Sequence, residues 1–168
     1  MQMYKNRIKY ISLNGIMLAV IMALQAINLP NLVTGVLVNA ILVFVYIFSG
    51  IKSAVLICLL SPFCGFITGH VPVLMYPVVP MIVLGNCTLI LLLSKLEKKS
   101  MFIKLFVPAL IKAAIIGVGG FMLVNIFLAD KTGNFLLFSV LGIQFFTAVP
   151  GVLLGLKLAE KFKKTLNR

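Results

Sequence analysis

Six long apolar runs, separated by short polar or proline-containing breaks, cover most of this chain and leave few folds open to it. A helix that crosses the hydrocarbon core of a membrane needs about 20 apolar residues. The sequence is 62% hydrophobic and 11% charged, whereas soluble domains carry about 25% charged residues. We therefore predict an all-α integral membrane protein, a six-transmembrane-helix bundle forming one domain over residues 1–168, with spans at about 11–29, 32–48, 53–68, 76–94, 108–128 and 135–156.

Positive charge is distributed unevenly between the two ends of these predicted spans. Thirteen of the fifteen Lys and Arg residues precede the first span, follow the last one, or lie in the breaks after the second and fourth spans. Lys131 lies in the break after the fifth span, on the opposite side of the predicted bundle, and Lys112 falls within the fifth span. Because basic residues are enriched on the cytoplasmic side of membrane proteins, both termini are predicted to be cytoplasmic. An even number of spans agrees with this orientation.

Proline marks the start of two predicted spans. Pro72, Pro77 and Pro80 precede or open the fourth span, where they favour irregular backbone. Irregular backbone at membrane depth must be covered by protein or line a cavity, so this segment is predicted to form a cavity wall before the helix becomes regular near Tyr76. Pro108 suits the first turn of a helix, and the fifth span is predicted to begin there.

The chain lacks the sequence patterns of the common catalytic and metal sites. It contains no phosphate-binding G-x-x-x-x-G-K-[ST] loop, no HExxH motif and no GxSxG motif. Cys58, Cys64 and Cys87 stand alone in apolar runs and match no metal-ligand spacing. The basic residues lie between apolar runs, which disfavours a nucleic-acid partner. We expect no enzyme activity, no cofactor and no metal site, and any use of ATP would require other subunits.

Four amide side chains stand out in the second, fourth, fifth and sixth predicted spans, where a polar group needs a partner or water. At about 1.5 Å per residue, they lie in the outer half or near the midplane of four different spans. They either line a cavity that opens outward and binds a small molecule, or they form hydrogen bonds between helices. These residues are Asn39, Asn86, Asn125 and Gln144.

Two other side chains bear on the chemistry of such a cavity. Lys112 is about one turn into the fifth span, so its stem is expected to reach the cytoplasmic surface. His70, the single histidine, is predicted in an outer loop, either as an exposed side chain or as a gate or ligand contact. No Asp or Glu lies within a span, which argues against a proton-coupled carrier.

Small residues form a stripe along the first span. With about 100° per residue, Gly15, Ala19 and Ala23 fall on one face of the helix, together with Ser12 and Ala26. Small residues let a second helix approach closely, so this face predicts a helix contact within the bundle or with a partner. Comparable stripes occur in the fifth and sixth spans, and the sequence leaves open whether all three pack together: Ala109, Ala113, Gly117, Gly120, Ala148, Gly151, Gly155 and Ala159.

In size and span layout the sequence resembles, over essentially its whole length, the substrate-binding S components of energy-coupling factor (ECF) vitamin transporters. Its most specific local feature is the A-x-x-x-A element Ala19-Val20-Ile21-Met22-Ala23 of the first span. The segments TGVLVNA at 34–40, LLSP at 59–62 and PMIVLGN at 80–86 also resemble patterns in unassigned members of that family.

The resemblance implies a high-affinity binding subunit of an ABC importer in a bacterial cell membrane, which captures a vitamin or related micronutrient from outside. A separate transmembrane T component would dock on Gly15, Ala19 and Ala23, two cytoplasmic ATPases would drive it, and the S component would topple to release its cargo. The fourth to sixth spans and the loops after the first and third would build the cavity. Substrate contacts are then expected, by location, at Asn31, Asn39, His70, Tyr76, Asn86, Asn125 and Gln144.

Two other classes of function fit the same sequence. One is a non-catalytic assembly or interaction subunit whose small-residue faces merely dock it in a larger complex. The other is a small autonomous carrier or channel. The spans contain no acidic residue, which disfavours a cationic substrate and favours a neutral or anionic, partly apolar molecule.

Overall fold

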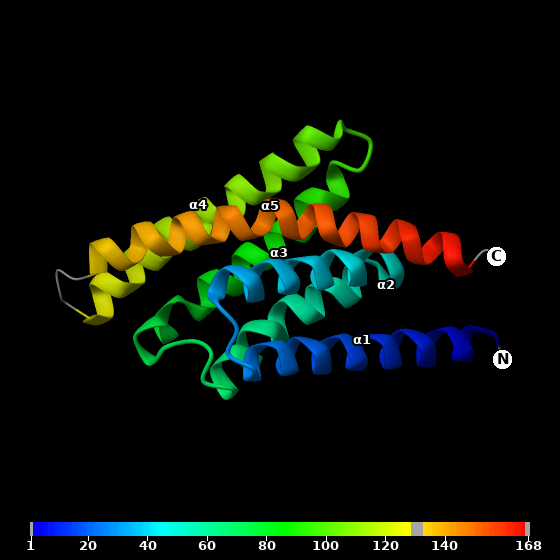
Figure 1. Cartoon of the computed structure of the whole chain (residues 1–168), viewed down its shortest axis with the longest axis horizontal. Coiled ribbons are helices and arrows are strands. Elements are labelled where there is room, and N and C mark those ends of the chain that lie inside the picture. Colours follow the sequence, from blue (N-terminus) through cyan, green and yellow to red (C-terminus); the bar gives the residue numbers. More distant parts are fainter. Residues whose placement is uncertain (1, 129–132, 167–168) are drawn as a thin grey trace.

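The computed structural model describes residues 2–128 and 133–166, which form helices joined by short turns (Figure 1). This part of the chain contains no strand, which confirms the all-α class. The elements are α1 (Gln2–Ala26), α2 (Asn31–Ile67), the 3-10 helix η1 (Val73–Val78), α3 (Val79–Lys95), α4 (Met101–Leu128) and α5 (Gly133–Leu166).

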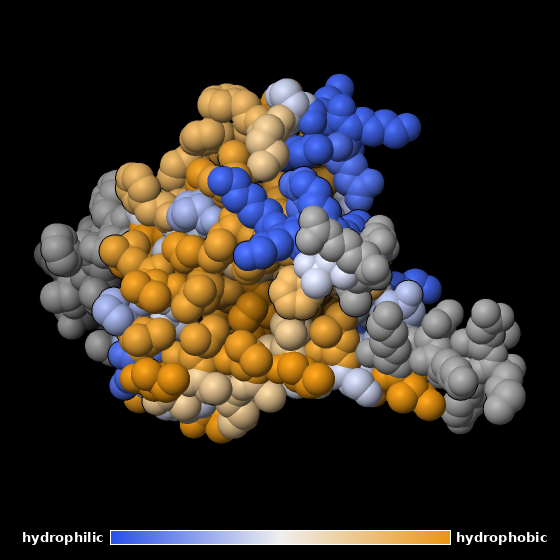
Figure 2. Space-filling view, turned by 45° about the vertical axis from the view of Figure 1, so that its right-hand side comes forward, coloured by the Kyte–Doolittle hydropathy of each residue, from blue (hydrophilic) through white to orange (hydrophobic). Residues whose placement is uncertain are grey.

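Four helical segments among the described residues are long and apolar enough to cross a membrane, and Tyr10–Ala26 of α1 is a shorter apolar one. Figure 2 shows most hydrophilic side chains gathered toward one end of the face in view, with hydrophobic side chains over much of the rest. These are properties of a membrane-embedded protein. The four segments are Asn31–Ile67, Met75–Lys95, Met101–Ile126 and Gly142–Thr165.

Two residues with positive φ set the paths of α1 and α2. Within α2, Gly50 has φ 83 and ψ 175, which is not helical, and the chain turns back on itself there (Figure 1). Glycine adopts such angles without the steric cost of a β-carbon. The reversal lies where the sequence predicts a break between the second and third spans. Asn28 follows α1 with φ 60, a conformation that asparagine tolerates better than most residues.

Both chain ends and the turn between α3 and α4 lie at the same end of the bundle in Figure 1. We call this the basic end, because Lys95 ends α3 there and the turn contains Lys98 and Lys99. The Tyr46 hydroxyl donates a hydrogen bond to the Glu97 carboxylate there. The opposite end, which we call the loop end, holds the connections 27–30 and 68–72.

The proline-rich segment before α3 is irregular, as predicted. It forms η1, and the regular helix begins at Val79 rather than near Tyr76. α4 begins at Met101, not at Pro108, which lies buried inside the helix. The apolar residues before Pro108 therefore belong to the same helix. A helix that packs against other helices tolerates the loss of the one hydrogen bond that proline removes.

α5 also exceeds its predicted span and continues through the basic residues to Leu166. Lys and Glu are good helix formers, and Lys164 forms a salt bridge with Glu160 at 2.8 Å, one helical turn away. At the other end of α5, the predicted turn at 130–134 lies partly outside the described residues. Gly133 and Asn134 already belong to the helix.

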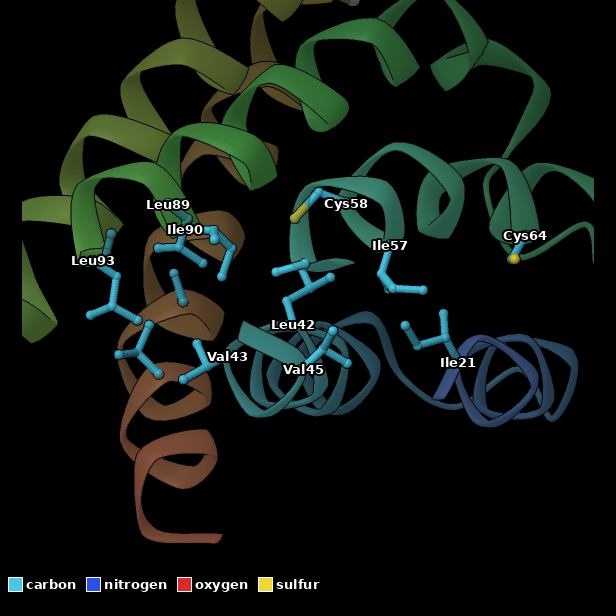
Figure 3. Close-up of a cluster of buried hydrophobic side chains, with 14 residues drawn as sticks. Ile21, Leu42, Val43, Val45, Ile57, Cys58, Cys64, Leu89, Ile90 and Leu93 are labelled. Atoms are coloured by element: carbon cyan, nitrogen blue, oxygen red, sulfur yellow. The ribbon is translucent and has the colours of Figure 1, made fainter. Parts of the chain in front are cut away.

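The core forms around α2, which packs against α1, α3 and α5, while α4 packs against α3 and α5. Figure 3 shows how Ile21 of α1 meets Ile57 and Val45 of α2, with Leu89, Ile90 and Leu93 of α3 beyond them. α1 packs mainly on α2, so it lies at the edge of the bundle. One side of α1 is therefore left uncovered.

The three stripes of small residues differ in what covers them. On α4 and α5 the stripe residues are buried, and they form internal packing faces. On α1, Gly15, Ala19 and Ala23 are all exposed, and nothing lies within 4 Å of a β-carbon built at Gly15. The three stripes therefore do not pack together within this chain.

Candidate functional site

A cavity of about 180 Å³ lies toward the loop end, between all five α-helices and η1. An apolar cavity of about 150 Å³ accommodates a benzene molecule, so this space suits a compound about one ring in size. Its apolar lining includes Val38, Met75, Val78, Ile82 and Ile143. Its polar lining comprises Gln25, Asn31, Thr34, Asn39, Ser61, His70, Asn86, Lys112, Gln144 and Thr147.

Lys112 lies in the wall of this cavity, and the expectation that its ammonium reaches the cytoplasmic surface is wrong. Its side chain is 2% exposed, and Nζ donates a hydrogen bond of 2.6 Å to Oδ1 of Asn39. Because α4 begins at Met101, Lys112 lies about 16 Å along the axis from the helix start, beyond the reach of a snorkelling side chain. Gly85 on α3 leaves room for its stem, since a β-carbon there would lie 3.3 Å from Cγ of Lys112.

Gln25 and Ser61 form a second polar group in the cavity wall. Nε2 of Gln25 donates to the backbone oxygen of Ser61 at 3.3 Å. The two side chains are 6% and 1% exposed, and neither Oε1 of Gln25 nor Oγ of Ser61 has a hydrogen-bond partner among the described residues. A buried polar atom without a partner costs about 1–3 kcal/mol, so these two oxygens favour a polar group in the cavity.

The two connections at the loop end contact each other beside the cavity. Nδ1 of His70 lies 3.2 Å from Oδ1 of Asn28, which joins the α1–α2 connection to the α2–η1 connection. The backbone nitrogen of Val71 donates to the oxygen of Gly65 at 3.1 Å and holds the second connection against α2. His70 and Val71 of the second connection both line the cavity.

The neutral form of His70 is favoured in the folded protein, because burial lowers its pKa below the ordinary value of 6.5. The unfolded chain therefore takes up a proton first as the pH falls through 6.5, and the folded state loses stability. We expect the thermal unfolding temperature to fall between about pH 7 and pH 5. The variant His70→Gln, which can still donate to Asn28, should show a weaker decrease.

His70 is the single histidine, and histidine is the side chain whose ordinary pKa lies in this pH range, so the pH scan is directed at this group. Circular dichroism of the detergent-solubilised protein measures the unfolding temperature. An equal decrease in His70→Gln would show that another group is responsible.

Five of the seven residues predicted to contact a substrate line the cavity: Asn31, Asn39, His70, Asn86 and Gln144. The other two do not line it. The ring of Tyr76 packs on Phe66 at a centroid distance of 4.4 Å. Asn125 is exposed and donates to the oxygen of Phe121, within its own helix, at 2.9 Å.

Five polar lining residues were not predicted from the sequence: Gln25, Thr34, Ser61, Lys112 and Thr147. Gln25 carried a usable signal, since it interrupts the first apolar run on the face opposite to the stripe of Gly15, Ala19 and Ala23. The two threonines carried none, because a threonine in a span can satisfy its hydroxyl within its own helix. Thr147 does so, donating to the oxygen of Gln144 at 3.2 Å.

The cavity differs from a metal centre in its chemistry. Among the residues with described side chains, no group of three or more His, Cys, Asp or Glu could hold a metal ion. Amides, hydroxyls and one ammonium instead offer hydrogen bonds to an organic molecule. No protein-family model, curated protein or solved structure matches this chain.

Proposed function

We propose that this chain is a membrane-embedded binding subunit of the ECF type, which captures a vitamin or related micronutrient for import. The cavity at the loop end is the observation that supports this most strongly. Buried polar side chains from separate helices converge on a space of about 180 Å³ with an otherwise apolar lining. Few convergent polar groups in an apolar pocket are typical of small-molecule sites.

In this proposal the chain crosses a bacterial cell membrane six times. α2 has 37 residues and would be about 55 Å long if straight, well beyond the hydrocarbon core of about 30 Å. Its reversal at Gly50 gives two arms of suitable length, and α1 supplies a further span. The basic end then faces the cytoplasm, as the positive-inside rule requires, and the cavity lies toward the outside.

The exposed stripe of α1 is the proposed docking face for a transmembrane T component, which cytoplasmic ATPases would drive. Gly15, Ala19 and Ala23 leave a shallow surface on a helix that packs mainly on α2. Close approach of small residues is how helices associate in lipid. The T component and the ATPases come from the sequence resemblance alone.

The proposal differs from the two alternative classes in a measurable way. Native mass spectrometry of the purified chain, with a thermal-shift panel of vitamins, should identify a bound or stabilising micronutrient. Ligand at 100 times its Kd stabilises a protein by about 2.7 kcal/mol, which is a clear shift. The chain reconstituted alone in liposomes should bind this compound but neither conduct nor accumulate it.

Conduction or net transport by the chain alone would identify a channel or an autonomous carrier. An assembly subunit would show no stabilisation by any compound in the panel. Either outcome would overturn the proposal.

A further inference from the structure

We propose that the cavity selects a small organic anion about one ring in size, whose carboxylate or similar group pairs with the ammonium of Lys112. This inference names the class of substrate and rests on the proposed binding function. It comes from the charge of the cavity wall, from the two oxygens without partners and from the size of the space.

Lys112 supplies the charge. Its ammonium is almost fully buried and is held by one neutral acceptor, Oδ1 of Asn39, at 2.6 Å. A buried ammonium loses most of its hydration, and a single amide oxygen replaces only part of it. An anion in the cavity would restore the missing interaction, and the hydrogen bond to Asn39 already fixes the position of the ammonium.

The remaining charged groups do not compete for this role. No Asp or Glu lies among the described residues that line the cavity. Glu97 accepts from Tyr46 at the basic end, and Glu160 pairs with Lys164 there. A cationic ligand would therefore be repelled by Lys112, and no carboxylate among these lining residues would compensate. The positive charge of the cavity wall favours an anion.

Gln25 and Ser61 define a second requirement. Because Nε2 of Gln25 faces the backbone oxygen of Ser61, Oε1 is the free atom, and it can only accept a hydrogen bond. A ligand N–H or O–H would satisfy it. Since Gln25 lies on α1 and Lys112 on α4, the acceptor and the cation come from different walls of the cavity.

Size and lining exclude larger or more highly charged compounds. The space of about 180 Å³ holds one ring with small substituents, and Lys112 is the one Lys or Arg among the described residues that line it. The apolar side chains between the polar groups, such as Val38 and Ile82, suit a hydrocarbon or aromatic body. The expected ligand is thus a monoanion with an apolar body and one hydrogen-bond donor.

The test uses three compounds that differ in one group each: 4-aminobenzoate has the anion and the donor, benzoate lacks the donor, and 4-aminobenzamide lacks the charge. Binding to the purified full-length chain is measured by isothermal titration and thermal shift. We expect 4-aminobenzoate to bind most tightly, benzoate more weakly, and 4-aminobenzamide not to bind.

Lys112→Met should weaken binding of 4-aminobenzoate about 100-fold or more, because it removes one partner of a buried, hydrogen-bonded charge pair. The variant should still fold, since the unbranched apolar chain removes a buried charge and this gain offsets the loss of the donor to Oδ1 of Asn39. Lys112→Gln keeps a donor for Asn39 and serves as a second variant. Lys104→Met removes the same charge from the same helix outside the cavity and should bind like the unaltered protein.

Each outcome separates the substrate class from the proposed function. Equal binding of 4-aminobenzamide, or undiminished binding of 4-aminobenzoate by a folded Lys112→Met variant, would overturn the anion inference and leave the binding function standing. The same holds if the vitamin panel yields only neutral or cationic ligands. If no probe and no vitamin of any charge binds, both proposals fall. An anionic vitamin whose binding is lost in Lys112→Met would support the inference as 4-aminobenzoate does.

Discussion

Combined substitution of Ala19→Leu and Ala23→Leu is expected to abolish ATP-driven uptake by the assembled transporter and to leave ligand binding by the purified chain unchanged. Both alanines are exposed on α1, on the face turned away from α2. A leucine at either position adds a branched side chain to a surface on which, in our proposal, a second helix backbone rests. Loss of close contact prevents helix association in lipid.

Uptake of labelled ligand by cells that contain the complete transporter measures the first effect, and isothermal titration on the purified variant measures the second. Ala114→Leu is the matched control, because Ala114 is an exposed alanine on α4, away from the stripe. That variant should transport normally. Loss of binding together with uptake in the α1 variant would show that the stripe supports the fold of the chain itself.

Gly155→Ala is expected to destabilise the bundle by about 3 kcal/mol, the upper part of the range for overpacking a core. A β-carbon at Gly155 would lie 2.6 Å from the backbone oxygen of Ala40 and 2.7 Å from Cβ of Val43. Backbone atoms cannot rotate away as a flexible side chain can, so α5 must separate from α2. Gly151 repeats the contact one turn earlier, where a β-carbon would lie 2.5 Å from Cβ of Asn39.

Gly142→Ala provides the matched control on the same helix, because no atom of the described side chains or backbone lies within 4 Å of a β-carbon at that position. Alanine has a higher helix propensity than glycine by about 1 kcal/mol, so this variant should be neutral or slightly more stable. Thermal unfolding in detergent compares the two variants. Equal stability of Gly155→Ala and Gly142→Ala would contradict the close packing of α5 on α2.

The all-α membrane class was predictable because it depends on the hydropathy of stretches of about 20 residues, which a few polar residues in each stretch do not change. The position of the reversal in α2 was predictable for a different reason, since Gly50 beside Lys52 combines a permissive backbone with a charge. The irregular segment before α3 was predictable because proline disrupts the hydrogen bonds of a regular helix. Pro72 and Met75 of that segment do line the cavity.

The side chains of the site were predictable only in part, because depth in a span is easier to read than the direction in which a side chain points. Asn39 and Asn86 were found by depth alone. The sequence places Lys112 near the membrane surface because Pro108 suits a helix start, whereas α4 begins at Met101 and so places Lys112 deeper. Gln25 lies on the face of its helix away from the small-residue stripe, and the stripe is the stronger pattern in that part of the sequence.

In the proposed importer, helix α1 would connect the docking face to the cavity. Ala23 lies on its outer face, and Gln25, two residues further along, lies in the cavity wall. A partner that shifted α1 against α2 would therefore also move Gln25 in the cavity wall. By thermodynamic reciprocity, if docking weakens ligand binding by some factor, the bound ligand weakens docking by that factor. In the proposed transporter, α1 alone would in this way couple release of the bound ligand to docking of the T component.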